Sequence, residues 1–288
     1  FDDDDDNDDE EEDAFEEVGN FDTFGSANAL ALTGNTLFVA DGRGGLLTLN
    51  VEDRSNTDIR SIFENSKSAS DVVINDTFVF LADSDEGVWA FKADDPSGKN
   101  WRVSKEQGFL HLAVRGNFLS GVGVDDTFYV FNIKDITEVK KVASFGLGTA
   151  VNDILFRDSR LYLATEESGL IWIDNPNGGT RSRDGGTDEF GQTIESIHLE
   201  GHYLYLGLED SVQVVDNRQP DKHQRDEVFN KEVDRLTALS VHRGYLYLAD
   251  GREGFYSVES GSGLKWEPVD PQPLSPKVED IHPYGEYI

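Results

Sequence analysis

Residues 151–175 read VNDILFRDSRLYLATEESGLIWIDN, and this stretch decides the fold. It contains three short runs that are rich in Ile, Leu, Tyr and Trp, at 153–156, 161–164 and 170–174, and polar residues or glycine separate them. Runs of this length and composition are typical of β-strands. The stretch therefore predicts three consecutive strands joined by short turns.

The same pattern recurs along the chain. It appears as ALALTGNTLFVADGRGGLLTLNVED from Ala29, as SDVVINDTFVFLADSDEGVWAFKADD from Ser70 and as TALSVHRGYLYLADGREGFYSVES from Thr237. The second predicted strand of each repeat begins 40 to 43 residues after that of the preceding repeat, at Leu37, Phe78, Phe118, Leu161, Tyr203, Tyr245 and Tyr287. A period near this value, with about four short strands per unit, is typical of a β-propeller. A helical solenoid would instead show a 3.6-residue periodicity, which the sequence lacks.

The sequence predicts an all-β fold, a β-propeller of seven blades with one incomplete blade closed by both termini. The C-terminal segments 278–283 and 286–288 match the first two strands of a repeat, and residues 16–22 match an outer strand. Closure by both ends of the chain leaves no open sheet edge. Six blades plus spare terminal strands is the alternative. The predicted domains are an acidic disordered tail at 1–14 and the propeller at 15–288.

The composition is strongly acidic. The chain has 57 Asp and Glu against 25 Lys and Arg, a formal net charge of −32. This charge repels nucleic acid and anionic membranes, whereas cations and basic partners remain compatible with it. Eleven of the first thirteen residues are acidic, and such a run is predicted to be disordered because it has nothing to bury.

Three absences bear on cellular location. The chain has no Cys, so it has neither disulfides nor thiolate metal ligands. No apolar run is long enough to be a transmembrane segment. The sequence also has no Met, and removal of a signal peptide explains that absence simply. The prediction is a secreted or cell-surface protein.

The repeat resembles the LVIVD repeat. The resemblance is carried by YLATEESGLIWIDN from Tyr162, FVADGRGGLLTLNVED from Phe38 and YLYLADGREGFYSV from Tyr245, and it extends over residues 27–288. It implies propeller architecture and a cell-surface or secreted protein of bacterial or archaeal type, and it brings no catalytic motif. Two repeats depart from the pattern: the stretch from Gly121 lacks the turn glycine, and the stretch from Gly207 lacks the glycine before the third strand.

An acidic turn recurs between the second and third strands of the repeats. In a propeller such turns lie on one face, where carboxylates could surround one mouth of the central channel and bind Ca²⁺, which prefers oxygen ligands. The simpler interpretation is that Asp and Gly are common turn residues, and no turn has the spacing of an established calcium loop. The predicted metal ligands are Asp83, Asp85, Glu86, Asp125, Asp126, Glu166 and Glu167.

A second set of polar residues stands near the starts of the inner strands. It comprises Asp71, Asn152, Asp153, Glu195 and Asp280. These residues could converge on a channel cation, as in metal-dependent lactonase-type propellers, or could simply cap the strand starts. His198 and His282 occupy equivalent places in their repeats, but the other repeats have no His there, so no histidine ring is predicted.

The sequence favours a non-enzymatic extracellular or cell-surface protein that acts in binding and scaffolding. Its expected partners are proteins or copies of itself, and an unfinished last blade favours homo-oligomers or filaments built through the terminal strands. The alternative is a metal-dependent, lactonase-like hydrolase with carboxylates at one channel mouth. No certain cofactor is predicted beyond the candidate Ca²⁺.

Overall fold

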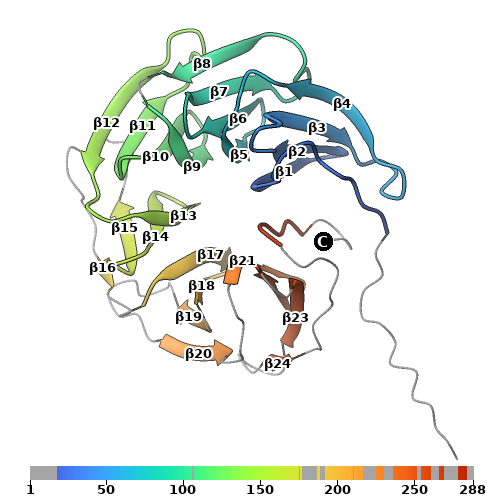
Figure 1. Cartoon of the computed structure of the whole chain (residues 1–288). Helices are drawn as coiled ribbons and strands as arrows, with labels where there is room; N and C mark the ends of the chain where they lie inside the picture. Colours follow the sequence, from blue (N-terminus) through green and yellow to red (C-terminus); the bar gives the residue numbers. More distant parts are fainter. Residues whose placement is uncertain are drawn as a thin grey trace, which may run out of the picture.

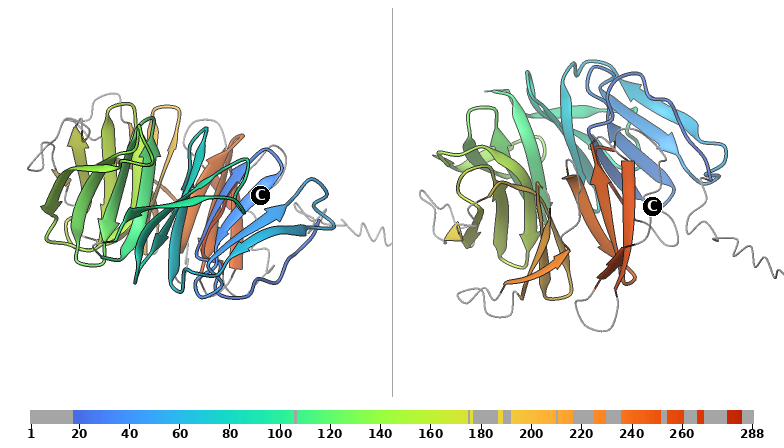
Figure 2. Two further views of the ribbon diagram at one scale, coloured as in Figure 1. Left: turned by 90° about the horizontal axis from the view of Figure 1, so that it is seen from above. Right: turned by 60° about the horizontal axis from the view of Figure 1, so that its bottom comes forward.

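A computed structural model describes residues 18–105, 107–174, 176, 187–188, 192–209, 211–216, 225–229, 236–251, 254–260, 266–268 and 278–283. These residues form six antiparallel sheets of four strands each, and every sheet is built from consecutive strands of the chain. The sheets are arranged around a common axis, with the first strand of each sheet nearest the axis (Figure 1). Side views show a thick disc in which the sheets stand beside one another (Figure 2).

The strands follow the predicted repeat. The inner strands are β1 (Ala29–Thr33), β5 (Ala69–Ile74), β9 (Phe109–Arg115), β13 (Val151–Arg157), β17 (Ile194–Glu200) and β21 (Leu236–His242). The second strands are β2 (Thr36–Ala40), β6 (Phe78–Asp83), β10 (Phe118–Gly123), β14 (Arg160–Thr165), β18 (Tyr203–Leu208) and β22 (Tyr245–Asp250).

The remaining two strands complete each sheet on its outer side. The third strands are β3 (Leu46–Asn50), β7 (Gly87–Lys92), β11 (Thr127–Asn132), β15 (Leu170–Asp174), β19 (Val212–Asp216) and β23 (Gly254–Ser260). The outer strands are β4 (Asp58–Phe63), β8 (Asn100–Ser104), β12 (Lys140–Gly146), β16 (Thr187–Asp188), β20 (Arg225–Phe229) and β24 (Trp266–Pro268). We number the sheets 1 to 6 in chain order.

The core lies between the sheets rather than inside any one of them. Because alternate residues of a strand point to opposite faces, each central strand contributes to two interfaces. Between sheets 2 and 3, Phe80 packs against Phe109 and Leu112, and all three are almost completely buried. Trp89, near the middle of β7, belongs to the interface of sheets 1 and 2. Hydrophobic packing between neighbours therefore holds the sheets in place.

The geometry of the turn between the second and third strands explains why the repeat favours glycine just before or at the start of the third strand. Gly87 has a φ of 106°, and a Cβ there would come within 2.4 Å of the Ser104 carbonyl oxygen. In sheet 3, where the glycine is missing, Asp126 adopts a φ of 57° in the corresponding turn. Asp tolerates this left-handed conformation better than most residues, so the turn survives the departure from the repeat pattern.

The prediction for the N-terminus is partly wrong. Residues 18–22, which belong to the outer strand predicted at 16–22, form no strand. Phe21 instead packs against Val39, Leu47 and Leu49 on the face of sheet 1 that is turned away from sheet 2. The half-buried Phe21 thus gives this part of the chain apolar packing on sheet 1 in place of strand pairing. Residues 1–17, including the acidic tail, lie outside the described residues.

The C-terminal segment 278–283 lies between sheet 6 and sheet 1. The segment is not assigned as a strand, but Ile281 is buried against Ala238, Tyr247 and Phe255 of sheet 6. Figure 1 shows this part of the chain beside β1 near the axis. Residues 284–288, which would supply the predicted second strand, lie outside the described residues. The described part of the chain contains no helix suited to crossing a membrane.

Candidate functional site

Asp83, the last residue of β6, is the centre of the acidic turn in sheet 2. Its side chain is fully buried, and its Oδ1 accepts hydrogen bonds from the N–H groups of Asp85 at 2.8 Å and Glu86 at 2.7 Å. Its Oδ2 accepts hydrogen bonds from the Ser66 hydroxyl at 2.5 Å and the Lys67 N–H at 3.1 Å. Burial alone would raise the pKa of Asp83, but these hydrogen bonds outweigh it and lower the pKa. Asp83 therefore ties its own turn to the loop that leads into β5.

Asp41 has the same position in sheet 1 and a similar role. It is fully buried, and its Oδ2 accepts hydrogen bonds from the N–H groups of Phe24 at 3.0 Å and Gly25 at 2.9 Å. In both sheets, the carboxylate at the end of the second strand pins the loop that precedes an inner strand. The recurring acid therefore has a structural role in these two sheets.

The other predicted metal ligands are engaged locally or lie at the surface. Asp85 accepts a hydrogen bond from the Ser68 hydroxyl at 2.6 Å, and Glu86 forms an ion pair with Arg102 at 3.0 Å. Asp125 accepts hydrogen bonds from the Gln107 amide at 2.9 Å and the Thr127 N–H at 3.2 Å. The remaining three, Asp126, Glu166 and Glu167, stand at the turns of sheets 3 and 4.

These acids do not gather into a metal centre. Among the described residues, no group of three or more His, Cys, Asp or Glu side chains is placed to hold a metal ion. Each turn belongs to a different sheet around the ring, so the carboxylates are spread over one face, which we call the turn face. The calcium site gains no support from this geometry and stays a prediction that a Ca²⁺ titration would test.

The polar residues near the axis do form a pattern, because they link each sheet to the next. One group donates a hydrogen bond from its side chain to a backbone carbonyl at the start of the following inner strand. The donors and acceptors are Asn28 to Ala69 at 2.7 Å, Ser70 to Phe109 at 2.7 Å, Asn152 to Ile194 at 3.0 Å and Thr237 to Val278 at 2.5 Å. The half-buried side chain of His111 also hydrogen-bonds to the backbone of Val151.

A second group accepts a hydrogen bond from a backbone N–H of the following inner strand. Leu112 donates to Asp71 at 2.6 Å, Ile197 donates to Asp153 at 2.9 Å, and Leu30 donates to Asp280 at 2.9 Å. The N–H of Leu239 donates in the same way to the Ser196 hydroxyl oxygen at 3.3 Å. We call both groups the seam latches.

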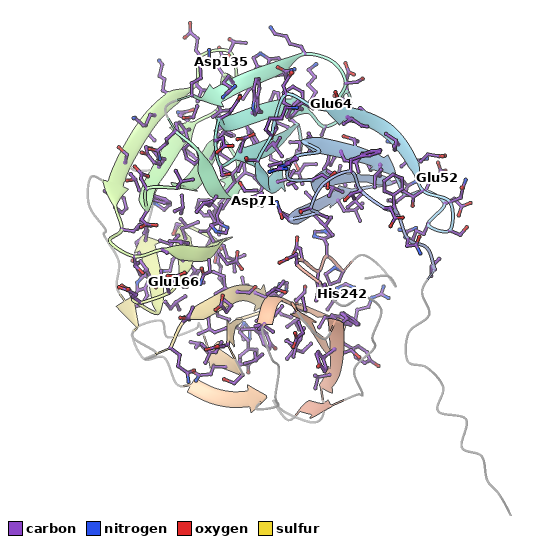
Figure 3. The ribbon with its side chains drawn as sticks, in the orientation of Figure 1. Glu52, Glu64, Asp71, Asp135, Glu166 and His242 are labelled. Atoms are coloured by element: carbon purple, nitrogen blue, oxygen red, sulfur yellow. The ribbon has the colours of Figure 1, made fainter. Side chains whose placement is uncertain are left out.

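The latch carboxylates use both oxygens. In Asp153, Oδ1 accepts the N–H of Ile154 at 2.7 Å, while Oδ2 also accepts the Ser196 hydroxyl at 3.1 Å. In Asp280, Oδ1 accepts the N–H of Ile281 at 2.8 Å. Asp153 and Asp280 thus each bind one N–H of their own segment and one of the following inner strand. Figure 3 labels Asp71 at the inner rim of the ring, where this contact is made.

Burial and neighbouring charges shift the pKa values of the latch carboxyls. Desolvation by burial raises the pKa of Asp71 and of Asp153 to about 7, and it also raises the pKa of Asp280. The hydrogen bonds from backbone N–H groups act in the opposite sense but do not cancel it, and repulsion among the three acids adds to it. Each of the three acids nevertheless keeps partial solvent exposure.

The sequence identifies part of this system. Asp71, Asn152, Asp153 and Asp280 are correctly placed near the strand starts, and the structure assigns each a seam contact. Glu195 also lies in β17. Asn28, Ser70 and Thr237 were missed, although each latch donor and its acceptor are about one repeat apart. That spacing could have revealed them, because a side chain at the start of one inner strand lies about one repeat before the backbone group that it contacts on the next inner strand.

Residues 24–61 match the model of the LVIVD repeat. The chain carries an LVIVD repeat. The matched range covers sheet 1 from the loop that Asp41 pins to most of β4. A comparison with curated proteins finds no significant match.

Solved structures confirm the β-propeller fold. The structure of U3-55K superposes with a TM-score of 0.68 at 12% identity, covering 85% of this chain and 80% of that one. The WD40 repeats of RRP9 give a TM-score of 0.68 at 12% identity, covering 85% and 79%. The computationally designed Ika8 protein gives 0.62 at 14% identity, covering 82% and 72%. At these identities the likeness concerns the fold alone.

A pair of substitutions separates the structural acid from its surface neighbour. Asp83→Ala leaves the buried Ser66 hydroxyl and several partly buried N–H groups without their acceptor, so we expect it to lower the free energy of unfolding by about 3 kcal/mol. Asp85→Ala, which removes one exposed hydrogen bond, should cost less than about 1 kcal/mol. Urea denaturation followed by circular dichroism measures both. Equal losses in the two variants would contradict the role given to Asp83.

Proposed function

We propose that the protein is a non-enzymatic β-propeller of the cell surface or the extracellular medium, and that it serves as a rigid platform for protein binding. The observation that carries the proposal is the use of the axial carboxylates. Asp153 and Asp280 engage both carboxylate oxygens with backbone N–H groups of adjacent strands. The residues that a hydrolytic propeller would use at its axis therefore serve here to join the sheets.

The turn face supplies a surface suited to a partner. Phe24, in the loop before β1, is 62% exposed, and Val124, in the turn after β10, is 48% exposed. Exposed Asp85, Asp125 and Glu166 stand at turns on the same face. Apolar side chains among carboxylates favour a basic partner that also offers apolar residues. The net charge of −32 disfavours nucleic acid.

We also propose that the ring has seven positions and that the C-terminal repeat occupies the seventh. Support comes from the segment 278–283, which receives a hydrogen bond from Thr237 of sheet 6 and one from Leu30 of sheet 1. The same bonds could form with the segment of another copy, because they depend only on the local sequence. Exchange of this segment would assemble copies into oligomers or filaments.

One observation favours the alternative of a hydrolase. A carboxyl with a pKa of about 7, such as that of Asp71, has the strength of a general base at neutral pH. If the protein hydrolysed esters or lactones, turnover should be lost in Asp71→Asn and kept in Asp76→Asn, which alters an exposed acid nearby. We expect no turnover in either variant or in the wild type. Turnover that depends on Asp71 would overturn the non-enzymatic proposal.

Binding at the turn face can be tested with a synthetic cationic amphipathic peptide built from Lys and Leu. We expect the double variant Phe24→Ser, Val124→Ser to bind it at least about tenfold more weakly than the wild type, because two exposed apolar contacts are lost. Isothermal titration calorimetry measures the dissociation constants. Val142→Ser, on the outer strand of sheet 3, is the matched control and should bind like the wild type. Equal binding by all three proteins would contradict the assigned surface.

The seventh position can be tested by truncation after Pro276. We expect a synthetic peptide of residues 277–288 to bind the truncated chain and raise its melting temperature, because the latches of Thr237 and Asp280 would reform. Light scattering and electron microscopy of the full chain at rising concentration should reveal oligomers. If the full chain stays monomeric without fibres, self-assembly is excluded. If the peptide has no effect, the seventh position is excluded.

A further inference from the structure

The turn between the inner and second strands is built differently in sheet 2 than in the other five sheets. In those five, the first residue of the turn has a φ between 50° and 59°, in the left-handed region that glycine adopts most readily. These residues are Gly34, Gly116, Asp158, Gly201 and Arg243. None of residues 75–77, which join β5 to β6, has a positive φ. The turn of sheet 2 must therefore be held by other interactions.

Asn75 holds this turn with its side chain. Its Oδ1 accepts hydrogen bonds from the N–H groups of Thr77 at 2.9 Å and Phe78 at 2.8 Å, and its own N–H donates to the Phe78 carbonyl oxygen at 3.0 Å. Asparagine commonly stabilises turns in this way. Because the backbone of the turn engages the amide oxygen, the amide nitrogen, on the other branch of the side chain, is directed away from that backbone.

The amide nitrogen of Asn75 lies beside open space. Its hydrogen bond to the Gly116 carbonyl oxygen, in the corresponding turn of sheet 3, is 3.5 Å long, which is near the limit for such a bond. Gly116 is exposed, and a Cβ added to it would have no heavy atom within 4 Å. Asp76 and Thr77 are exposed as well. An enzyme could therefore reach this nitrogen, and a substituent on it would have room.

Asn75, Asp76 and Thr77 also form the triplet Asn-X-Ser/Thr, with a middle residue other than proline, which is the acceptor motif for N-linked glycans. No other asparagine in the sequence has Ser or Thr two positions later. The triplet by itself is short enough to arise by chance. Here it coincides with an exposed turn that its own asparagine holds, and with open space beside the amide nitrogen.

We propose that Asn75 is an N-glycosylation site. The co-substrate is an oligosaccharide carried on a lipid pyrophosphate, and a membrane-bound oligosaccharyltransferase catalyses the transfer. Nδ2 of Asn75 attacks C1 of the first sugar and forms an N–C1 bond. The bond from C1 to the pyrophosphate oxygen breaks, and its electron pair leaves with the lipid pyrophosphate. Nδ2 gives up one proton to a base of the transferase, and no group is oxidised or reduced. The hydroxyl of Thr77 is the group by which such a transferase recognises the site.

The glycan would lie on the face of the disc opposite the turn face. β6 begins at Phe78, next to the Asn75 turn, and ends at Asp83, in the turn face. A bulky, solvating substituent at Asn75 would shield the opposite face and leave the turn face open to a partner. The inference rests on the extracellular location in the proposed function, because this transfer takes place outside the cytoplasm.

Mass spectrometry of the full chain, expressed in the organism that encodes it, tests the proposal. We expect the intact wild type to exceed its sequence mass by one oligosaccharide, and we expect peptide mapping to place the glycan on Asn75. Thr77→Val, which removes the hydroxyl but keeps the Asn75 side chain, should lose the glycan. Thr77→Ser, the matched control, keeps the hydroxyl and should keep the glycan. Circular dichroism checks that both variants fold; if Thr77→Val does not, the peptide map of the wild type decides by itself.

Fractionation of the same cells separates the ways in which the proposal can fail. An unglycosylated wild type in the medium or the cell envelope would overturn the proposed site and leave the extracellular location intact. An unglycosylated wild type in the cytoplasm would overturn both. A folded Thr77→Val variant that carries as much glycan as the wild type would also overturn the proposal, because the modified residue would then lie elsewhere.

Discussion

The inner strand of every sheet is an edge, and the whole ring depends on how that edge is satisfied. An edge strand leaves alternate N–H and C=O groups without a partner in its own sheet. Here a side chain from the preceding repeat reaches across and binds one of them. Asp71 accepts the N–H of Leu112, and Ser70 donates to the carbonyl of Phe109, so one seam is closed by two adjacent residues. The contact that satisfies the edge also joins the sheets.

This arrangement divides the work between two kinds of interaction. Apolar packing such as that of Phe80 against Phe109 supplies most of the attraction between sheets, but it has little directional preference. The seam latches are directional and fix the height at which one inner strand lies beside the next. Their cost is the desolvation of carboxyls near the axis, which the raised pKa values of Asp71 and Asp153 record. Three repeats place a carboxyl at this position, whereas the Ser196 hydroxyl accepts the corresponding N–H without a charge to desolvate.

Much of the fold could be predicted because the repeat is written in strand patterns that are local. The stretch 151–175 predicts β13, β14 and β15 with ends that differ from the structure by at most two residues. The latches were harder to predict, since the partner of Asn28 lies one repeat away and a single repeat does not reveal it. Residues 18–22 of the predicted N-terminal strand form no strand, and Phe21 packs on sheet 1 instead. The acidic turns suggested cation ligands, but the Asp83 carboxylate is occupied by its own loop.

Side chains of one repeat protect backbone N–H groups of the next, and the closure of the ring depends on this protection. The most direct test is amide exchange measured by NMR at single residues in the wild type at pH 6.5. We expect slow exchange for the N–H groups of Leu30, Leu112 and Ile197, which donate to the latch carboxylates from the following inner strand. We expect faster exchange for the N–H groups of Leu32, Val114 and Leu199. Each lies two residues farther along the same strand, where the backbone N–H points to the same side. Equal exchange in the two sets would contradict the claim.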